Sequence, residues 1–123
     1  MKRDLELIRN ILIAVKMFQN QFDLPLLKEI LGFSTVDAVT FYQHVVLLSE
    51  AGLVTTKKVH NDLEDFLAPT HLTISGCGFL ENIQIEKIWS RLLVLDSKEN
   101  SSLGLILLVP LANFYSKELK SLI

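Results

Sequence analysis

The fold of this chain is decided by one stretch, HVVLLSEAGLV, which occupies residues 44–54. Val45 and Leu48 are three residues apart, so both lie on the helix face that packs against a core. Gly52 follows the helical pattern and tolerates the left-handed backbone conformation that ends many helices. Leu53 then starts a strand with an inward-pointing side chain. The stretch therefore predicts a helix that passes through a glycine directly into a strand.

Three helices are predicted up to this junction. Apolar residues recur at helical spacing over residues 3–18 and form a wide apolar face. Pro25 suits the first position of a short second helix, and Gly32 suits its end. Ser34 or Thr35 is the expected cap of the third helix, which runs to the glycine of the quoted stretch.

A hairpin and further helices are predicted after the junction. Residues 53–59 are β-branched and predict a strand, residues 60–65 a polar loop, and residues 71–74 the returning strand. The later segments are a break at residues 75–78, a helix in one or two pieces over 79–95, a polar link over 96–102, and a last helix over 103–123, kinked or restarted at Pro110.

The order of these elements is helix, helix, helix, strand, strand, which is the order of a winged helix. We therefore expect a mainly α fold with a small β-hairpin, namely a winged helix-turn-helix plus C-terminal helices. Residues 1–95 would form the winged-helix domain with its following helix. Residues 96–123 would form a linker and a C-terminal helical arm.

Several segments in this order resemble an uncharacterised family of small winged-helix proteins found in bacteria and their prophages. The matching segments are Met1–Asp4, residues 44–54, Leu72–Gly76, Phe79–Leu80 and Trp89. The resemblance implies a fold and a phage-linked setting, and it implies no activity. The stretch 44–54 also resembles winged-helix transcriptional regulators in general.

The overall charge is unusual for a nucleic-acid binder. The formal net charge is −2, whereas DNA-binding domains usually carry a basic surplus that neutralises phosphates. The single cysteine, Cys77, excludes a disulfide framework. We expect a cytoplasmic protein, because no signal peptide is visible and the apolar run over residues 103–112 is too short to span a membrane.

Candidate DNA contacts lie on the predicted helix-turn-helix and on the wing. Arginine-to-guanine contacts are not available from the third helix, because residues 34–51 contain no lysine or arginine. For His44 the alternative is a structural role in the core, and for the two wing lysines it is a solvated strand end. The candidates are Lys28, Thr35, Thr40, Gln43, His44, Lys57 and Lys58.

Two functions remain open. The first is a regulatory DNA-binding protein of winged-helix type, related to phage or prophage. The alternative is a protein-interaction module that inhibits or modulates host defence or transcription machinery without binding DNA. The neutral third helix and the acidic residues Asp62, Glu64 and Asp65 at the wing favour the alternative, and the element order favours the first.

The last helix has almost no polar face before Asn113, so one small core is not expected to cover it. A homodimer through this helix is one prediction, and folding back between the first helix and the Trp89 helix is the other. The candidate dimer residues are Leu103, Leu105, Ile106, Leu108, Val109 and Phe114.

No catalytic site, metal site or cofactor site is predicted. Cys77 lies between two glycines, and no ligand spacing such as C-x-x-C or H-x-x-x-H occurs. The chain also lacks a glycine-rich phosphate loop. We therefore expect a protein that is not an enzyme.

Overall fold

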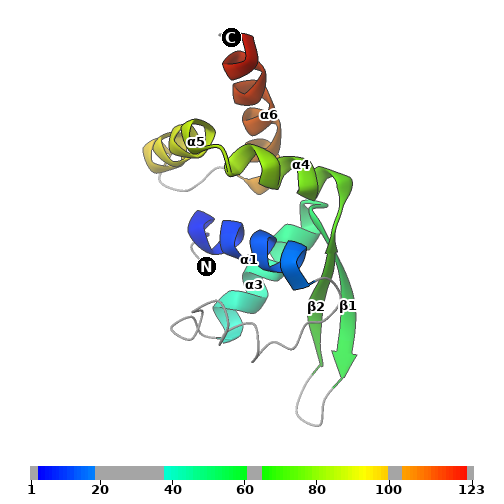
Figure 1. Ribbon diagram of the computed structural model, residues 1–123. Coiled ribbons are helices and arrows are strands. Elements are labelled where there is room, and N and C mark those ends of the chain that lie inside the picture. Colours follow the sequence, from blue (N-terminus) through cyan, green and yellow to red (C-terminus); the bar gives the residue numbers. More distant parts are fainter. Residues whose placement is uncertain (1–2, 19–37, 61–64, 100–103, 122–123) are drawn as a thin grey trace.

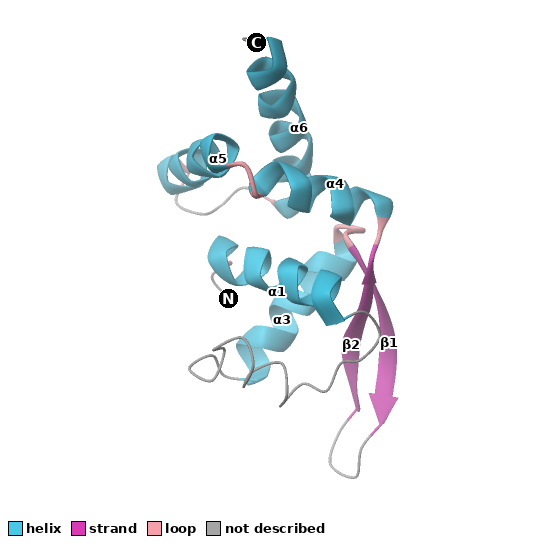
Figure 2. Cartoon of the chain, in the orientation of Figure 1, coloured by secondary structure: helices cyan, strands magenta, loops and turns pink. Residues whose placement is uncertain are grey.

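The computed structural model describes residues 3–18, 38–60, 65–99 and 104–121 (Figures 1 and 2). The predicted mainly α fold with a small β-hairpin is confirmed. The predicted second helix, with Lys28, and the predicted cap at Thr35 lie outside these residues. In the part described, no helix has both the length and the hydropathy to cross a membrane. The elements are α1 (Leu5–Phe18), α3 (Ala38–Glu50), β1 (Val54–His60), β2 (Asp65–Leu72), α4 (Ile74–Ile83), α5 (Glu86–Lys98) and α6 (Leu105–Ser121).

The hairpin and the C-terminal helix lie at opposite ends of the molecule. In Figure 1, α1 crosses α3, the β1–β2 hairpin extends downwards from beside them, and α4 lies above α1. Helix α1 contacts α3, α4 and β2, whereas α6 contacts α4 and α5. The end of α6 therefore points away from the tip of the hairpin.

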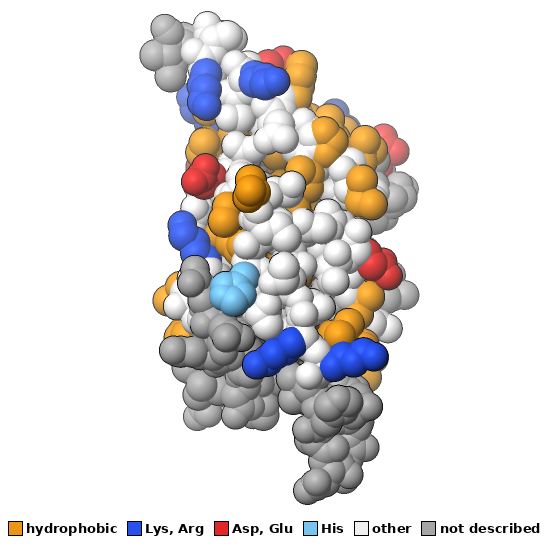
Figure 3. Space-filling model, turned by 90° about the vertical axis from the view of Figure 1, so that its right-hand side faces the viewer, with side chains coloured by type: hydrophobic (Ala, Val, Ile, Leu, Met, Phe, Trp, Pro, Cys, Tyr) orange, Lys and Arg blue, Asp and Glu red, His pale blue; other side chains and the backbone are white. Residues whose placement is uncertain are grey.

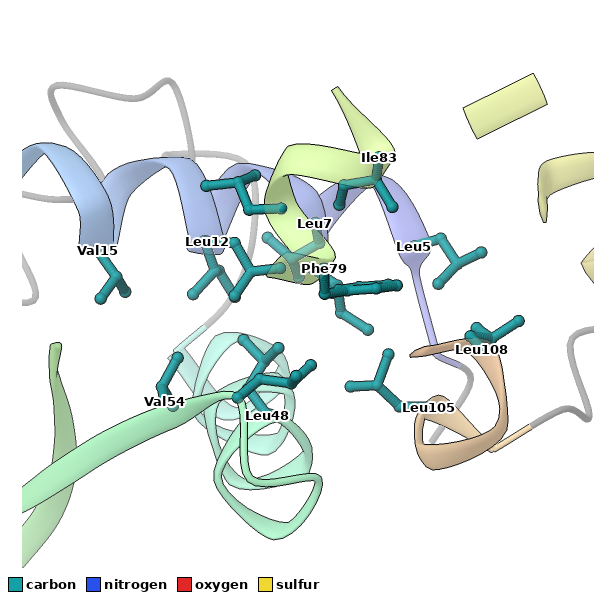
Figure 4. Close-up of a cluster of buried hydrophobic side chains, with 14 of the residues drawn as sticks. Leu5, Leu7, Leu12, Val15, Leu48, Val54, Phe79, Ile83, Leu105 and Leu108 are labelled. Atoms are coloured by element: carbon teal, nitrogen blue, oxygen red, sulfur yellow. The ribbon is translucent and has the colours of Figure 1, made fainter. Parts of the chain in front are cut away.

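One apolar core joins all these elements, and α1 is at its centre. Seven of the 14 residues of α1 are buried, at the helical spacing that the sequence predicts. Figure 4 shows Leu12 of α1, Leu48 of α3, Phe79 of α4 and Leu108 of α6 pointing towards one another. Full burial of a leucine stabilises a fold by about 1.5–3 kcal/mol. The hydrophobic effect therefore holds helices from both ends of the chain in one unit.

The junction between α3 and β1 has the predicted geometry. Gly52 has a φ of 73°, in the left-handed region where a Cβ would be strained. The Leu53 N–H donates to the Leu48 carbonyl at 3.0 Å, and the Gly52 N–H donates to the Ser49 carbonyl at 3.0 Å. These two bonds form a Schellman motif, and its apolar pair, Leu48 and Leu53, is fully buried.

The hairpin is longer than predicted. Strand β2 spans Asp65–Leu72, so the predicted returning strand over 71–74 begins too late and ends too late. Of the predicted loop over 60–65, His60 and Asp65 belong to strands, and residues 61–64 lie outside the described residues. The two strands pair antiparallel from Val54 with Leu72 to His60 with Asp65, with an irregularity between Thr55 and Thr56. Pro69 does not end the strand, because each strand of a two-stranded sheet has one edge without a ladder partner.

Helix α4 begins at Ile74, so the predicted break over 75–78 was wrong. Thr73 is the N-cap: its hydroxyl accepts from the Gly76 N–H at 2.9 Å and donates to the Gly52 carbonyl at 2.6 Å. A Cβ at Gly76 would overlap the carbonyl oxygen of Leu53. Gly76 is therefore needed for close packing of α4 on the α3–β1 junction, and it does not interrupt the helix.

The predicted helix over 79–95 is in two pieces, α4 and α5, which are separated at Gln84 and Ile85. Helix α5 continues to Lys98, so the predicted polar link does not start at Asp96. Asp96 is buried and forms an ion pair with Arg3. The Asp96 carboxylate can be buried on this helix because Arg3, from the start of the described chain, balances its charge.

Helix α6 is continuous, with Pro110 inside it and no restart. Leu105, Leu108 and Ala112 are buried in the same core as α1 and α4. The opposite side of α6 exposes Ile106 and Phe114. The start of the helix therefore folds back onto the chain's own core.

The close approach at Gly76 can be tested with a matched pair of substitutions. Gly76→Ala places a methyl group against the Leu53 backbone, and we expect a loss of about 3 kcal/mol in the free energy of unfolding. Gly78→Ala is the control, because a Cβ there meets nothing within 4 Å; we expect no loss and a gain of up to about 1 kcal/mol. Urea denaturation measures both. Equal stability of the two variants would contradict the packing described.

Candidate functional site

Two basic side chains stand on the hairpin. Lys57 and Lys58 are both exposed on β1, where they pair with Ala68 and Leu67 of β2. Neighbouring residues of a strand point to opposite faces, so the two ammonium groups lie on either side of the hairpin. Figure 3 shows basic side chains at this end of the described surface. The hairpin therefore carries positive charge on both faces.

The described surface of α3 is neutral or acidic. Thr40 and Gln43 are half-buried, Val39 is 65% exposed, and Glu50 is exposed at the end of the helix. The helix contains no lysine or arginine from Ala38 to Glu50. Thr40 and Gln43 can supply hydroxyl and amide groups to a ligand, but α3 supplies no positive charge.

His44 is fully buried, and the expectation that it contacts DNA is wrong. Its Nε2 accepts from the Asp4 N–H at 2.9 Å, and its Nδ1 donates to the Thr40 carbonyl at 2.8 Å. Both ring nitrogens are therefore used inside the fold. The imidazole joins the start of α1 to α3, which is the structural role that the sequence left open.

Three residues, two before α1 and one within its first half, are fixed by polar or cation–π contacts. The Asp4 carboxylate caps the helix by accepting from the N–H groups of Glu6 at 3.0 Å and Leu7 at 3.2 Å. Arg3 pairs with Asp96 of α5 in a site where both side chains are less than a tenth exposed. The guanidinium carbon of Arg9 lies 4.3 Å from the ring centroid of Trp89. These contacts hold α5 against α1.

A groove lies between α5 and α6. It consists of two hollows of about 470 and 380 Å³, both lined in part by Arg91 and Tyr115. Arg91 Nη1 lies 2.6 Å from Glu118 Oε2, and the Arg91 guanidinium carbon lies 5.2 Å from the Tyr115 ring centroid. Lys87 lines the first hollow and Lys98 the second. We call this feature the α5–α6 groove.

A family model described as "Hypothetical protein (DUF2513)" matches residues 2–102. The chain belongs to the DUF2513 family. The match covers the elements from α1 to α5, and α6 lies outside it. The expected membership of an uncharacterised family is thus confirmed, whereas the winged-helix and prophage parts of that resemblance stay predictions. No curated protein and no solved structure matches the chain.

In this DUF2513 protein, the candidate dimer residues fall into different environments. Leu105 and Leu108 are buried in the chain's own core, so their side chains are not available to a second copy. Val109 is half-buried. Ile106 is 70% exposed and Phe114 is 55% exposed, and Leu103 lies outside the described residues.

The α5–α6 groove was not predicted from the sequence. A basic face could have been predicted from the helical spacing of Lys87, Arg91 and Lys98. The helix was expected to end before Asp96, however, so Lys98 was assigned to a link and not to this face. Within the described ranges of the DUF2513 protein, no group of three His, Cys, Asp or Glu side chains could hold a metal ion. Cys77 is exposed.

The structural role of His44 predicts a loss of stability on its removal. His44→Leu leaves the part-buried Asp4 N–H without its acceptor, and we expect a loss of about 2 kcal/mol in the free energy of unfolding. His71→Leu is the control, because His71 is exposed on β2; its expected change is within about 0.5 kcal/mol. Thermal and urea melts measure both. A His44→Leu protein as stable as the control would contradict this role.

Proposed function

We propose that this DUF2513 protein is a winged-helix protein that binds double-stranded DNA in a regulatory role, inside the cell and in a phage or prophage setting. The observation that carries the proposal is the exposed pair Lys57 and Lys58, on a hairpin joined to α3 by a rigid turn. The order α1, α3, β1, β2 supports a winged helix, with the hairpin as its wing.

The charge distribution indicates which contacts this protein would make. The wing lysines would contact phosphates, which position a protein on DNA without specifying sequence. Gln43 suits an adenine edge, and Thr40 suits a thymine methyl group or a phosphate. Since α3 has no basic side chain from Ala38 to Glu50, most of the affinity would come from the wing. We therefore expect weak binding with a shallow dependence on salt.

A second candidate function is the protein-interaction module that acts without DNA, on host defence or transcription machinery. The neutral surface of α3 favours it, because a dedicated DNA reader usually presents arginine or lysine there. Both functions are compatible with a homodimer through the outer side of α6.

The proposed homodimer uses three residues of α6 spaced by four: Ile106, Pro110 and Phe114, all exposed. A spacing of four places them on one side of the helix. Around a two-fold axis at Pro110, Ile106 of one copy would meet Phe114 of the other, as an isologous interface requires. No charged residue occurs in α6 before Lys117, so like charges would not oppose this contact.

The DNA proposal predicts a loss of binding when the charges of the wing are reversed. In a fluorescence-anisotropy titration with a mixed-sequence duplex at low salt, we expect binding at tens of micromolar. Lys57→Glu/Lys58→Glu should weaken it at least about tenfold, since two phosphate contacts become repulsive. The control Lys117→Glu/Lys120→Glu has the same change in net charge on exposed residues of α6 and should stay within about twofold. No binding by the unmodified protein would end the proposal.

The dimer proposal predicts that charges on the outer side of α6 give monomers. Ile106→Glu/Phe114→Glu should convert a dimer of the 13.9 kDa chain to a folded monomer, because a buried pair of like charges opposes association. Light scattering after size-exclusion chromatography measures the mass. The control is Val94→Glu, which adds a carboxylate at another exposed apolar residue, on α5. A monomeric unmodified protein would contradict the proposal.

A further inference from the structure

The α5–α6 groove has a basic side formed by one helix. Lys87, Arg91 and Lys98 are four and seven residues apart along α5, which places them on a single face. Lys87 lines the first hollow, Lys98 lines the second, and Arg91 lines both. From Lys87 to Lys98 the helix rises about 16 Å, which is three turns. The basic side therefore has the length of a short helix.

The same groove has an apolar floor. Ile88 and Leu119 line the first hollow, Val94 and Leu95 line the second, and the Tyr115 ring lies between them. Val94 is 56% exposed, so part of this apolar surface faces solvent. An apolar floor beside a row of cations is complementary to a ligand that has one apolar side and one acidic side.

The charge of the groove is not balanced from within. Among the described residues that line it, Glu118 is the acidic one, and its carboxylate is already 2.6 Å from Arg91. Lys87 and Lys98, at the two ends, are both exposed. A ligand with carboxylates about three helical turns apart would meet one lysine at each end.

We propose that the α5–α6 groove binds an acidic amphipathic helix of a partner protein. Its apolar residues, at helical spacing, would pack on Val94, Tyr115 and Leu119, and its carboxylates would face Lys87 and Lys98. A partner carboxylate near Arg91 would replace Glu118 as its ion-pair partner. This binding does not depend on the wing, which lies at the other end of the molecule (Figure 1).

The groove suits a protein ligand better than a nucleic acid. The sugars and phosphates of a nucleic acid would leave the floor at Val94 and Leu95 without an apolar partner. An acidic helix covers both parts at once. Charge complementarity and burial of the floor therefore indicate the same class of ligand.

Three synthetic peptide probes separate charge from apolar contact. The first is a fluorescein-labelled 16-residue amphipathic helix with leucines on one side and glutamates on the other. The second replaces glutamate with lysine, and the third replaces leucine with glutamine. In anisotropy titrations with the full chain, we expect the first to bind and the other two to bind at least about tenfold more weakly, because each lacks one half of the complementarity.

Two double variants locate the binding. Lys87→Glu/Lys98→Glu should weaken binding of the acidic peptide at least about tenfold, whereas Lys57→Glu/Lys58→Glu, with the same change in net charge, should stay within about twofold. Val94→Gln should also weaken binding of the acidic peptide, because it removes apolar surface from the floor without changing the net charge. Circular dichroism checks that each variant is folded; the five substituted residues are all exposed.

Four results would overturn the proposal. These are no binding of the acidic peptide, equal binding of the lysine peptide, equal losses in the two double variants, and loss of duplex DNA binding in Lys87→Glu/Lys98→Glu alone. The last would identify the groove as a nucleic-acid site. If the protein binds the acidic peptide but not DNA, the proposed DNA function is refuted and the proposed peptide binding by the groove is supported. Failure of one proposal can therefore be distinguished from failure of the other.

Discussion

The structure depends on the close packing of the α4 N-terminus against the turn between α3 and β1. The Leu53 carbonyl accepts from the Thr73 N–H at 3.0 Å, and Gly76 lies so near that carbonyl that a side chain would not fit. The Thr73 hydroxyl reaches the Gly52 carbonyl in the same place. These contacts join the two ends of the hairpin to the helices on both sides of it. The direction of the hairpin and the position of α4 are therefore set together.

A second group of polar contacts fixes the residues before α1. His44 Nε2 accepts a hydrogen bond from the Asp4 N–H, and the carboxylate of Asp4 caps α1. Arg3 extends to Asp96, 93 residues later in the chain. The Arg3–Asp96 pair balances two charges that would each be costly to bury alone, and His44 supplies an acceptor for the Asp4 N–H. The apolar core supplies most of the stabilisation, and these bonds determine how α1 and α5 meet.

Local patterns in the sequence predicted the parts of the fold that local physics determines. The α3–β1 turn was predicted because Gly52 and the apolar pair around it form a motif that neighbouring residues complete by themselves. Thr73 and Gly76 were misjudged, because the need for glycine there arises from Leu53, which is distant in sequence. Asp96 was also misjudged, since a polar residue is assigned to the surface unless its partner is known, whereas for His44 a role in the core was one of the two alternatives. The groove needs α5 and α6 together, and their packing is not contained in either segment.

The central position of α1 has a consequence for how the chain folds during synthesis. Helix α1 is synthesised before the other described elements, and the core cluster to which its apolar face belongs includes Leu105, Leu108 and Ala112 of α6. Until those residues emerge, that face has no complete cover, and a segment of this kind is prone to associate with other nascent chains or with chaperones. The core of the described residues is therefore completed only after α6 has been synthesised.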